Sequence, residues 1–385
     1  MIPYGRQNIS QEDIDSVCET LRSDFLTQGP KVLLLESAIC DATQATHTIC
    51  VNSATSALHL ACMALELTVN DEVWVSPISF VASSNCILYC GAKPVFIDID
   101  SETNNICINQ VEEKLKKYKT ENKSMPKVII AVHLSGLSCE MKKLSKLSEK
   151  YGFSIIEDAS HAIGAYYNGK PVGCCEFSDI TVFSFHPVKI ITTGEGGAAV
   201  TNDSLLAEKI RSLRSHGITR DKTLLKEDHG PWYYEQQALG YNYRLTDIQA
   251  ALGVSQMKRL DEFIDNRIEV SKFYLESLKE LPIELPHISS ESVSSWHLFI
   301  IKLNLQAISK THKQVFEALR DEGVGVNLHY IPIYKQPYYQ EINYKYDPCE
   351  VAENYYNRAI SIPIYHGITK QQQQAVVNAL TKVLL

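Results

Sequence analysis

The sequence lacks two features that mark large classes of proteins: long apolar runs and Cys-x-x-Cys motifs. No run reaches the roughly 20 apolar residues that a membrane-spanning helix requires, so we expect no membrane partner. The eleven cysteines are scattered and form no Cys-x-x-Cys pair, which argues against a zinc ribbon or a thioredoxin motif. We therefore predict no metal site and interpret most of the cysteines as small buried residues in a reducing cytoplasm.

Positive charge is also scarce. The 385 residues include 37 lysines and arginines against 45 aspartates and glutamates, which gives a net charge of −8. Nucleic-acid binding requires a basic face, so we expect no nucleic-acid partner. The start of the chain, Met1 to Gln7, shows no apolar segment typical of a signal peptide. These absences together predict a cytoplasmic globular protein.

Short apolar segments alternate with helical patterns over the first two thirds of the chain. Strands that are apolar on both faces are typical of a sheet covered by helices on both sides. The sequence therefore predicts an α/β fold with a mostly parallel sheet, whose ligands bind beyond the strand ends. The expected strands span 48–51, 72–75, 94–97, 127–133, 153–156, 179–183 and 198–201, and helices are expected over 55–67 and 81–89.

A different pattern follows in the last third of the chain. We divide the chain into a large α/β domain, residues 1–250, and a smaller C-terminal α+β domain, residues 251–385. The N-terminal segment 1–25 can also pack on the smaller domain. A helix over 245–260 is expected to lead out of the large domain, followed by a strand over 295–301, a helix over 313–322, a strand after 324–326 and a closing helix over 371–385.

The most informative chemical signal is a pair of charged residues near strand ends, Asp158 and Lys189. Asp158 follows the apolar strand over 153–156, and Lys189 lies just before a glycine-rich turn over 192–197. A lysine can form a Schiff base with pyridoxal phosphate, and an aspartate can keep the pyridine nitrogen protonated so that the ring accepts electrons. Taken alone, such a pair is more often a strand-end carboxylate and a surface lysine.

Three weaker signals fall at similar junctions. Segment 52–57 leads from a strand into a helix N-terminus rich in small and hydroxylated residues, which suits either a phosphate cradle or ordinary N-capping. Phe80 follows a strand and could stack on a cofactor ring, although such an aromatic residue is more often part of the core. His161 follows Asp158 by one helical turn or less, where it could contact the same ligand or play a structural part.

Six ordered motifs together carry a family resemblance. In order and type they resemble the DegT/DnrJ/EryC1/StrS family of pyridoxal phosphate-dependent nucleotide-sugar aminotransferases. The resemblance covers nearly the whole chain and implies the pyridoxal phosphate-dependent transferase fold type I, which is aspartate aminotransferase-like. The motifs are Asn-Ser-Ala-Thr-Ser-Ala at 52–57, Glu-Asp-Ala-Ser-His-Ala at 157–162, Ser-Phe-His-Pro-Val-Lys at 184–189, Gly-Glu-Gly-Gly-Ala at 194–198, Arg-Ser-His-Gly at 214–217 and Tyr-Asn-Tyr-Arg-Leu-Thr-Asp-Ile-Gln-Ala-Ala at 241–251.

The resemblance implies a role for each residue around the cofactor ring. Lys189 is expected to hold pyridoxal phosphate and, once released, to move the proton during catalysis. Asp158 is expected to pair with the pyridine nitrogen. Phe80 matches the aromatic residue that stacks on the ring, and His161 matches a position near the ring hydroxyl.

The resemblance also implies how the cofactor phosphate is held. Ala54, Thr55 and Ser184 match phosphate-binding positions of the family. Asn242 matches an asparagine that reaches the phosphate from the neighbouring subunit, so we expect a homodimer with shared active sites. Arg244 stays outside the predicted site because it could merely form an ion pair within its own helix.

The expected substrates follow from the same resemblance. The amino donor is expected to be glutamate. Segments 2–9 and 214–221 look most like the pseudaminic acid branch of the family, which aminates C4 of UDP-2-acetamido-2,6-dideoxy-β-L-arabino-hexos-4-ulose to give UDP-4-amino-4,6-dideoxy-N-acetyl-β-L-altrosamine. Enzymes for other nucleotide 4-keto sugars, of the perosamine or bacillosamine type, are the nearest alternatives. The candidate substrate contacts, each of which could instead be an ordinary surface residue, are Tyr4, Arg6, His216, Arg220, His329 and Tyr330.

Three other roles are alternatives to transamination. Family members that act as 3-dehydratases carry histidine at the lysine position, whereas this chain has Lys189. A cysteine desulfurase requires a catalytic cysteine in a mobile loop, and no cysteine of this sequence lies in a recognisable one. A non-catalytic scaffold would tolerate the loss of Lys189 or Asp158, and both are present. These observations favour transamination.

Overall fold

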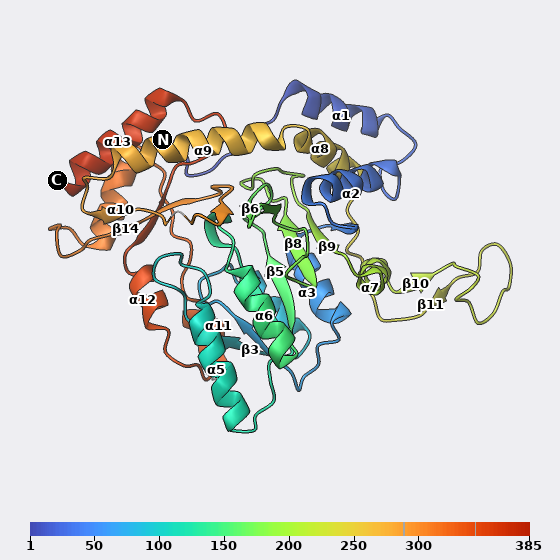
Figure 1. Ribbon diagram of the computed structural model, residues 1–385. Coiled ribbons are helices and arrows are strands. Elements are labelled where there is room, and N and C mark those ends of the chain that lie inside the picture. The colour runs from blue at the N-terminus through green and yellow to red at the C-terminus, as the bar shows by residue number, and fades with distance from the viewer. Residues whose placement is uncertain (288, 343) are drawn as a thin grey trace.

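A computed structural model describes residues 1–287, 289–342 and 344–385 (Figure 1). Its centre is a seven-stranded sheet with the strand order β1-β9-β8-β5-β4-β2-β3. Strands β3, β2, β4, β5 and β8 run parallel, whereas β9 pairs antiparallel with both β8 and β1. The predicted α/β fold with a mostly parallel sheet is confirmed. The strands are β1 (His47–Val51), β2 (Glu72–Val75), β3 (Lys93–Phe96), β4 (Val128–Val132), β5 (Ser154–Asp158), β8 (Ile180–Ser184) and β9 (Gly197–Thr201).

Helices cover this sheet, and α9 crosses from the sheet layers toward the C-terminal part of the molecule (Figure 1). The helices that precede α9 are α1 (Gln11–Leu21), α2 (Pro30–Thr43), α3 (Ala54–Ala64), α4 (Ala82–Tyr89), α5 (Ile108–Thr120), α6 (Met141–Tyr151), α7 (Ser204–Arg214) and α8 (Asp247–Met257). The helices that follow in sequence are α9 (Leu260–Ser277), α10 (His312–Asp321), α11 (Pro337–Glu341), α12 (Glu350–Tyr356) and α13 (Lys370–Leu384).

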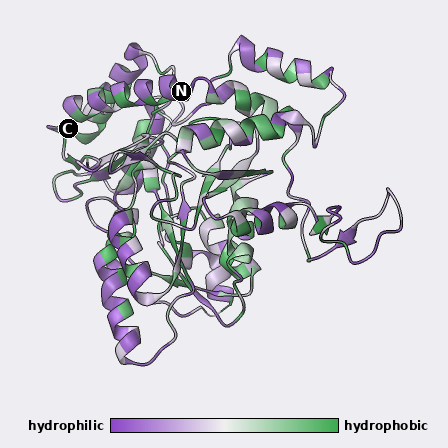
Figure 2. Cartoon of the chain, turned by 45° about the vertical axis from the view of Figure 1, so that its right-hand side comes forward, coloured by the Kyte–Doolittle hydropathy of each residue, from purple (hydrophilic) through white to green (hydrophobic). Residues whose placement is uncertain are grey.

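The central strands send successive side chains into two different cores. Ile129 and Ile155 pack with buried residues of α5 and α6, whereas Ile130 and Ile156 pack with buried residues of α3 and α4. Successive side chains of a strand point to opposite faces, so a sheet covered on both faces requires apolar residues at every position. Strand β4 is buried throughout. Figure 2 shows the corresponding gathering of hydrophobic residues at the centre of the molecule.

A smaller antiparallel sheet forms the C-terminal part of the fold. It has the order β12 (Ile283–Glu284), β14 (Phe299–Leu303), β15 (Ala359–Ile362), and it shares a buried core with α9, α10 and α13. The start of the chain joins this part, because the Ile2 amide donates to the Gly323 carbonyl at 2.7 Å. Helix α1 instead packs on α8. The division of the chain near residue 250 stays a prediction.

Two details of the sequence-based interpretation are wrong. Within the described residues, the strand expected directly after 324–326 does not form. Val324 makes a single parallel bridge with Ile2, so pairing with the N-terminal residues replaces a longer ladder. The helix expected over 245–260 ends at Met257 and stays packed on α1 and α2, because its small apolar residues face those helices. Helix α9 is the element that leads out of the sheet layers.

The expectation that most cysteines are buried is also wrong. All eleven are free thiols, but only five are buried. The other six are half-buried because several lie at helix ends or in turns, as Cys90 does at the C-cap of α4. The buried cysteines are Cys50, Cys62, Cys86, Cys139 and Cys349.

A hairpin projects from the body of the molecule between α7 and α8 (Figure 1). Its two short strands are β10 (Ile218–Thr219) and β11 (Glu235–Gln236). The hairpin leaves Trp232 with 71% of its surface exposed and Leu239 with 76% exposed. The remaining small sheet pairs β6 (Tyr166–Tyr167) with β7 (Lys170–Pro171) and β13 (Ser292–Val293). Among the described helices, none combines the length and hydropathy that crossing a bilayer demands.

Candidate active site

A cavity of about 640 Å³ opens where β5 and β8 end, between the first turns of α3 and α4 and the segment 327–330. Its position agrees with the rule that ligands of parallel sheets bind beyond the carboxyl ends of the strands. Ten of the predicted site residues line this one cavity although they are spread over most of the sequence: Tyr4, Ala54, Thr55, Phe80, Asp158, His161, Ser184, Lys189, His329 and Tyr330.

Asp158 is the last residue of β5 and its carboxylate is buried, with 5% of the residue exposed. Two hydroxyls donate to it, Ser83 to Oδ2 at 2.6 Å and Ser160 to Oδ1 at 2.5 Å. The Ser160 amide also donates to Oδ1 at 3.2 Å. Hydrogen bonds of this kind stabilise the ionised carboxylate and fix its orientation. The site therefore presents a held negative charge.

Lys189 is half-buried in the turn that follows β8. Burial lowers its pKa to about 8 from the usual 10.5, and the attraction of Asp158 opposes this change only in part. A lysine with such a pKa has a substantial neutral fraction near neutral pH, which makes it both a nucleophile and a proton carrier. These are the two properties that the predicted role demands.

His161 is buried and held in a single protonation form. Burial, and then the positive charge of Lys189, lower its pKa well below the usual 6.5, so the ring is neutral. The Ser135 amide donates to Nδ1 at 3.2 Å, which leaves the ring proton on Nε2. Nε2 lies 3.2 Å from the Tyr330 hydroxyl, so His161 donates to Tyr330 and the phenol can donate into the cavity.

The N-terminus of α3 forms another part of the cavity wall. Ser53 caps the helix by accepting from the Ser56 amide at 3.1 Å, whereas the amides of Ala54 and Thr55 belong to the first turn, which has no carbonyl partners within the helix. Gly197 of β9 passes so close that a Cβ there would lie 2.5 Å from the Ala54 nitrogen. Unpaired amides at a helix N-terminus suit a phosphate group.

Phe80 stands at the mouth of the cavity with 58% of its surface exposed. Its ring centroid lies 6.2 Å from that of Tyr330. The alternative interpretation of Phe80 as a core residue is therefore wrong. An exposed aromatic ring beside a cavity offers a flat apolar face for stacking on another ring.

Four predicted residues do not line the cavity of their own chain: Arg6, His216, Arg220 and Asn242. Arg6 is exposed near the N-terminus. His216 and Asn242 lie at the base of the projecting hairpin, and Arg220 lies further along it, with its guanidinium 5.6 Å from the Tyr234 ring centroid. Arg244 makes no ion pair with Asp247 among the described residues. The Asp247 carboxylate instead accepts from the amides of Gly29 and Lys31.

Sequence reasoning missed three residues of this site. Ser83 and Ser160 hold the Asp158 carboxylate, and only Ser160 had a usable signal, since a serine two residues after an aspartate often closes a local turn. His297 is buried against His161, with ring centroids 4.4 Å apart. It comes from a distant part of the chain, so local sequence patterns do not point to it.

The sequence model of the DegT/DnrJ/EryC1/StrS aminotransferase family matches residues 7–381. The chain belongs to this family. A UDP-4-amino-4,6-dideoxy-N-acetyl-β-L-altrosamine transaminase of Campylobacter jejuni subsp. jejuni serotype O:23/36 is 38% identical over 385 residues, which cover 100% of this chain and 98% of that relative.

Two solved structures of sugar-processing relatives resemble the fold over its full length. Helicobacter pylori PseC, an aminotransferase involved in the biosynthesis of pseudaminic acid, has a TM-score of 0.90 at 35% identity and covers 100% of this chain and 99% of its own. Spr1654 of Streptococcus pneumoniae, in its pyridoxal phosphate form, has a TM-score of 0.88 at 28% identity and covers 100% of both chains. These similarities confirm the predicted family and the fold type I architecture.

Like the other aminotransferases of the DegT/DnrJ/EryC1/StrS family, the protein is an enzyme that uses pyridoxal phosphate. The residues of the cavity fit this cofactor, because a lysine of lowered pKa, a held carboxylate, an exposed aromatic ring and a free helix N-terminus face one space. When bound, the cofactor supplies an aldehyde carbon for an amine and an aromatic ring that accepts electrons.

Proposed function

We propose that this sugar aminotransferase moves an amino group from glutamate to C4 of UDP-2-acetamido-2,6-dideoxy-β-L-arabino-hexos-4-ulose, within pseudaminic acid biosynthesis. The product is then UDP-4-amino-4,6-dideoxy-N-acetyl-β-L-altrosamine. The observation that carries this proposal is the full-length similarity to an altrosamine transaminase and to PseC, at 38% and 35% identity. The cavity supports it with a lysine whose pKa is lowered to about 8 and with a carboxylate that is held by hydrogen bonds.

In this proposal the residues of the cavity divide the work. Lys189 holds the cofactor through its Nζ and, when released, takes a proton from the reacting carbon and returns it, which a pKa near 8 permits. Asp158 keeps the ring nitrogen of the cofactor protonated, and Ser83 orients the carboxylate. Phe80 stacks on the ring.

The remaining cavity residues bind the cofactor phosphate and the substrates in this proposal. Ala54, Thr55 and Ser184 hold the phosphate. His161 positions the Tyr330 hydroxyl toward the cavity. Tyr4, His329 and Tyr330 contact the sugar nucleotide, because they line the same cavity from the N-terminal and C-terminal parts of the chain.

We propose a homodimer with shared active sites. Asn242, His216 and Arg220 lie on or beside a hairpin that projects into solvent, so their own chain does not bring them to its cavity. The hairpin carries exposed Trp232 and Leu239, and large exposed apolar residues favour burial in an interface. In this arrangement Asn242 reaches the phosphate of the neighbouring subunit, and Arg6, His216 and Arg220 contribute positive charge to the sugar nucleotide.

The test of the substrate is a half-reaction assay on the purified enzyme. Glutamate should discharge the visible absorption of the bound cofactor, and a 4-keto sugar that is a true acceptor should restore it. A panel of UDP- and dTDP-4-keto sugars then identifies the acceptor. Restoration by the UDP-4-keto-N-acetylhexosamine alone supports the proposal, whereas preference for a perosamine- or bacillosamine-type precursor assigns the enzyme to that branch.

Two coarser proposals accompany this function. The large and small domains are proposed to meet near residue 250, where α8 gives way to α9. A cytoplasmic location is proposed on the eleven free thiols, since disulfides form and persist in oxidising compartments.

A further inference from the structure

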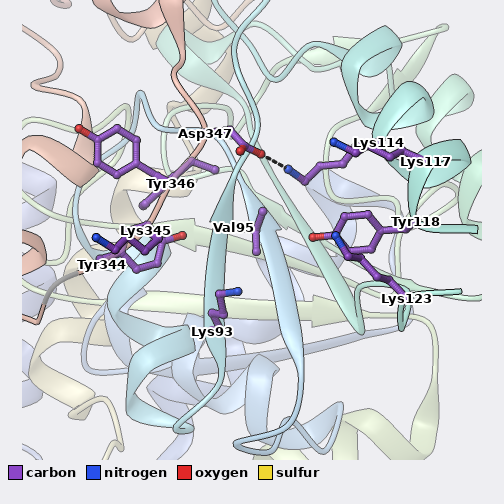
Figure 3. Close-up of a pocket in the computed structure, with 11 residues that line it drawn as sticks. Lys93, Val95, Lys114, Lys117, Tyr118, Lys123, Tyr344, Lys345, Tyr346 and Asp347 are labelled. Carbon is purple, nitrogen blue, oxygen red and sulfur yellow. Dashed lines mark hydrogen bonds and ion pairs between the residues drawn. The ribbon is translucent and has the colours of Figure 1, made fainter. Parts of the chain in front are cut away.

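A second cavity, of about 250 Å³, lies at the edge strand β3, between α5 and the segment 344–347 (Figure 3). We call it the lysine hollow, defined by Lys93, Lys114, Lys117, Lys123 and Lys345 in its wall. It shares no lining residue with the cavity around Lys189. Its walls come from three stretches of sequence that the fold brings together.

Charge is strongly one-sided in the lysine hollow. Five lysines and one carboxylate, that of Asp347, line it, which amounts to a net charge of +4. The whole chain carries −8, so a positive concavity of this size departs from the character of the rest of the surface. Focused positive potential of this kind attracts small anions.

Asp347 is the internal counter-ion of the hollow. Its carboxylate lies 2.6 Å from the Lys114 ammonium, as the dashed line in Figure 3 shows, and 77% of its side chain is exposed. The hydrogen bond from Lys114, together with the attraction of Lys114, Lys117 and Lys123, lowers the pKa of Asp347. Three lysines therefore share the attraction of one exposed carboxylate.

The other lysines differ in how they are compensated. Lys93 pairs with Glu72 at 2.9 Å and Lys123 with Glu121 at 2.8 Å, and both carboxylates lie outside the hollow's wall. Within the described part of the chain, Lys117 has no carboxylate inside the 4.0 Å ion-pair distance. Lys117 thus contributes an unpaired positive charge to the hollow.

Aromatic rings complete the wall. The Tyr118 hydroxyl donates to Glu72 at 3.0 Å, and the Tyr344 hydroxyl donates to the Pro94 carbonyl. Because both hydroxyls are used by the protein, these residues offer ring faces and not free donors. The main polar groups of the hollow are the lysine ammonium groups, which bind phosphate oxygens as point charges, beside the hydroxyl of Tyr346.

We propose that the lysine hollow binds a small phosphorylated compound with at least two negative charges, separate from the substrates of the catalytic cavity. A monovalent anion would merely exchange with the Asp347 carboxylate, whereas a divalent group neutralises more of the excess positive charge. A volume of about 250 Å³ accommodates a diphosphate or a sugar phosphate. The inference does not rest on the proposed sugar substrate.

The test is a calorimetric titration of the pyridoxal phosphate-loaded enzyme with pyrophosphate at fixed, low ionic strength. Lys117→Gln should weaken binding about three- to fivefold, the size of one exposed ion pair. Asp347→Asn should strengthen it by a similar factor, because it removes the competing counter-ion. Lys119→Gln is the matched control, since Lys119 is an exposed lysine of the same helix that does not line the hollow, and it should change the affinity less than twofold.

Three outcomes of this titration would contradict the proposal. Absence of pyrophosphate binding to the wild-type enzyme, or equal losses in Lys117→Gln and Lys119→Gln, would overturn it, since equal losses indicate unspecific attraction. An Asp347→Asn variant with unchanged or weaker binding would also overturn it. Transamination by all three variants should match that of the wild type, which separates this site from the catalytic cavity.

Discussion

The cavity around Lys189, which we call the catalytic cavity, and the lysine hollow both contain lysine and aspartate. The pKa values of their lysines are shifted in opposite directions. In the catalytic cavity one half-buried lysine faces one buried aspartate, and burial lowers the pKa of Lys189 to about 8. In the lysine hollow the side chain of Lys123 is 56% exposed and its partner Glu121 raises its pKa. Burial therefore decides which lysine reacts as a neutral amine and which stays a fixed positive charge.

The largest effect is expected when the reactive amine of this pair is removed. Lys189→Ala should reduce transamination by about 10⁴-fold or more, because it removes both the attachment point of the cofactor and the proton carrier. Turnover of glutamate and the sugar substrate measures the loss, and circular dichroism checks the fold. Lys123→Ala in the lysine hollow is the control and should leave turnover unchanged. A Lys189→Ala enzyme with near wild-type turnover would sink the assignment of this residue.

The pH dependence of amine reactivity should distinguish the two lysines next. In the cofactor-free protein, acetylation of Lys189 should rise with pH and reach half of its maximum near pH 8, since the neutral amine reacts and appears as pH passes the pKa. Lys123 should reach that point above pH 10.5 because its pKa is raised. Mass spectrometry after brief acetylation at several pH values measures both. Equal midpoints for the two lysines would contradict the role given to burial.

The lowered pKa of Lys189 also makes the free energy of unfolding depend on pH. The pKa of Lys189 is lower in the folded than in the unfolded chain, where it takes its usual value of 10.5. Between about pH 8 and 10.5 the unfolded chain therefore binds more protons, so the contribution of Lys189 to the free energy of unfolding increases with pH in this window. Below pH 8 its contribution is unfavourable and constant.

The proposed dimer predicts a smaller effect at the projecting hairpin. Asn242→Ala should weaken the binding of pyridoxal phosphate about tenfold, which is the size of a hydrogen bond to a charged group. Fluorescence titration of the cofactor-free protein measures this affinity. Gln236→Ala, an exposed residue of the same hairpin, should leave it unchanged. Equal affinity in the wild type and Asn242→Ala would count against a phosphate contact from the neighbouring subunit.

The smallest expected effect concerns the serine that holds the carboxylate. Ser83→Ala removes the 2.6 Å hydrogen bond to Asp158, and we expect a loss of about 0.5–1 kcal/mol in cofactor binding. Ser84→Ala is the control, because Ser84 is equally buried on the same helix but bonds to Val81 and Tyr339 instead. Both variants should lose some thermal stability, but only Ser83→Ala should lose cofactor affinity. Parallel loss in both variants would reduce Ser83 to a structural role.

Local patterns explain why much of the fold was predictable. Strand β4, Val128–Val132, is apolar at every position because both faces of the sheet are covered, and that leaves a continuous signal in the sequence. The strand expected after 324–326 is absent from the described residues, where Val324 instead makes a single bridge with Ile2 from the far end of the chain. Short-range patterns cannot report such a partner.

The sequence by itself determined the α/β architecture, the family and the cofactor, and it predicted the roles of Lys189 and Asp158, because apolar strands and ordered motifs are local features. Only the tertiary structure decided the rest. It placed Ser83 on the Asp158 carboxylate, lowered the pKa of Lys189 by burial, and assembled the lysine hollow from β3, α5 and the segment 344–347. These properties depend on the distances between residues far apart in the chain and on the burial of their side chains. Local sequence patterns specify neither quantity.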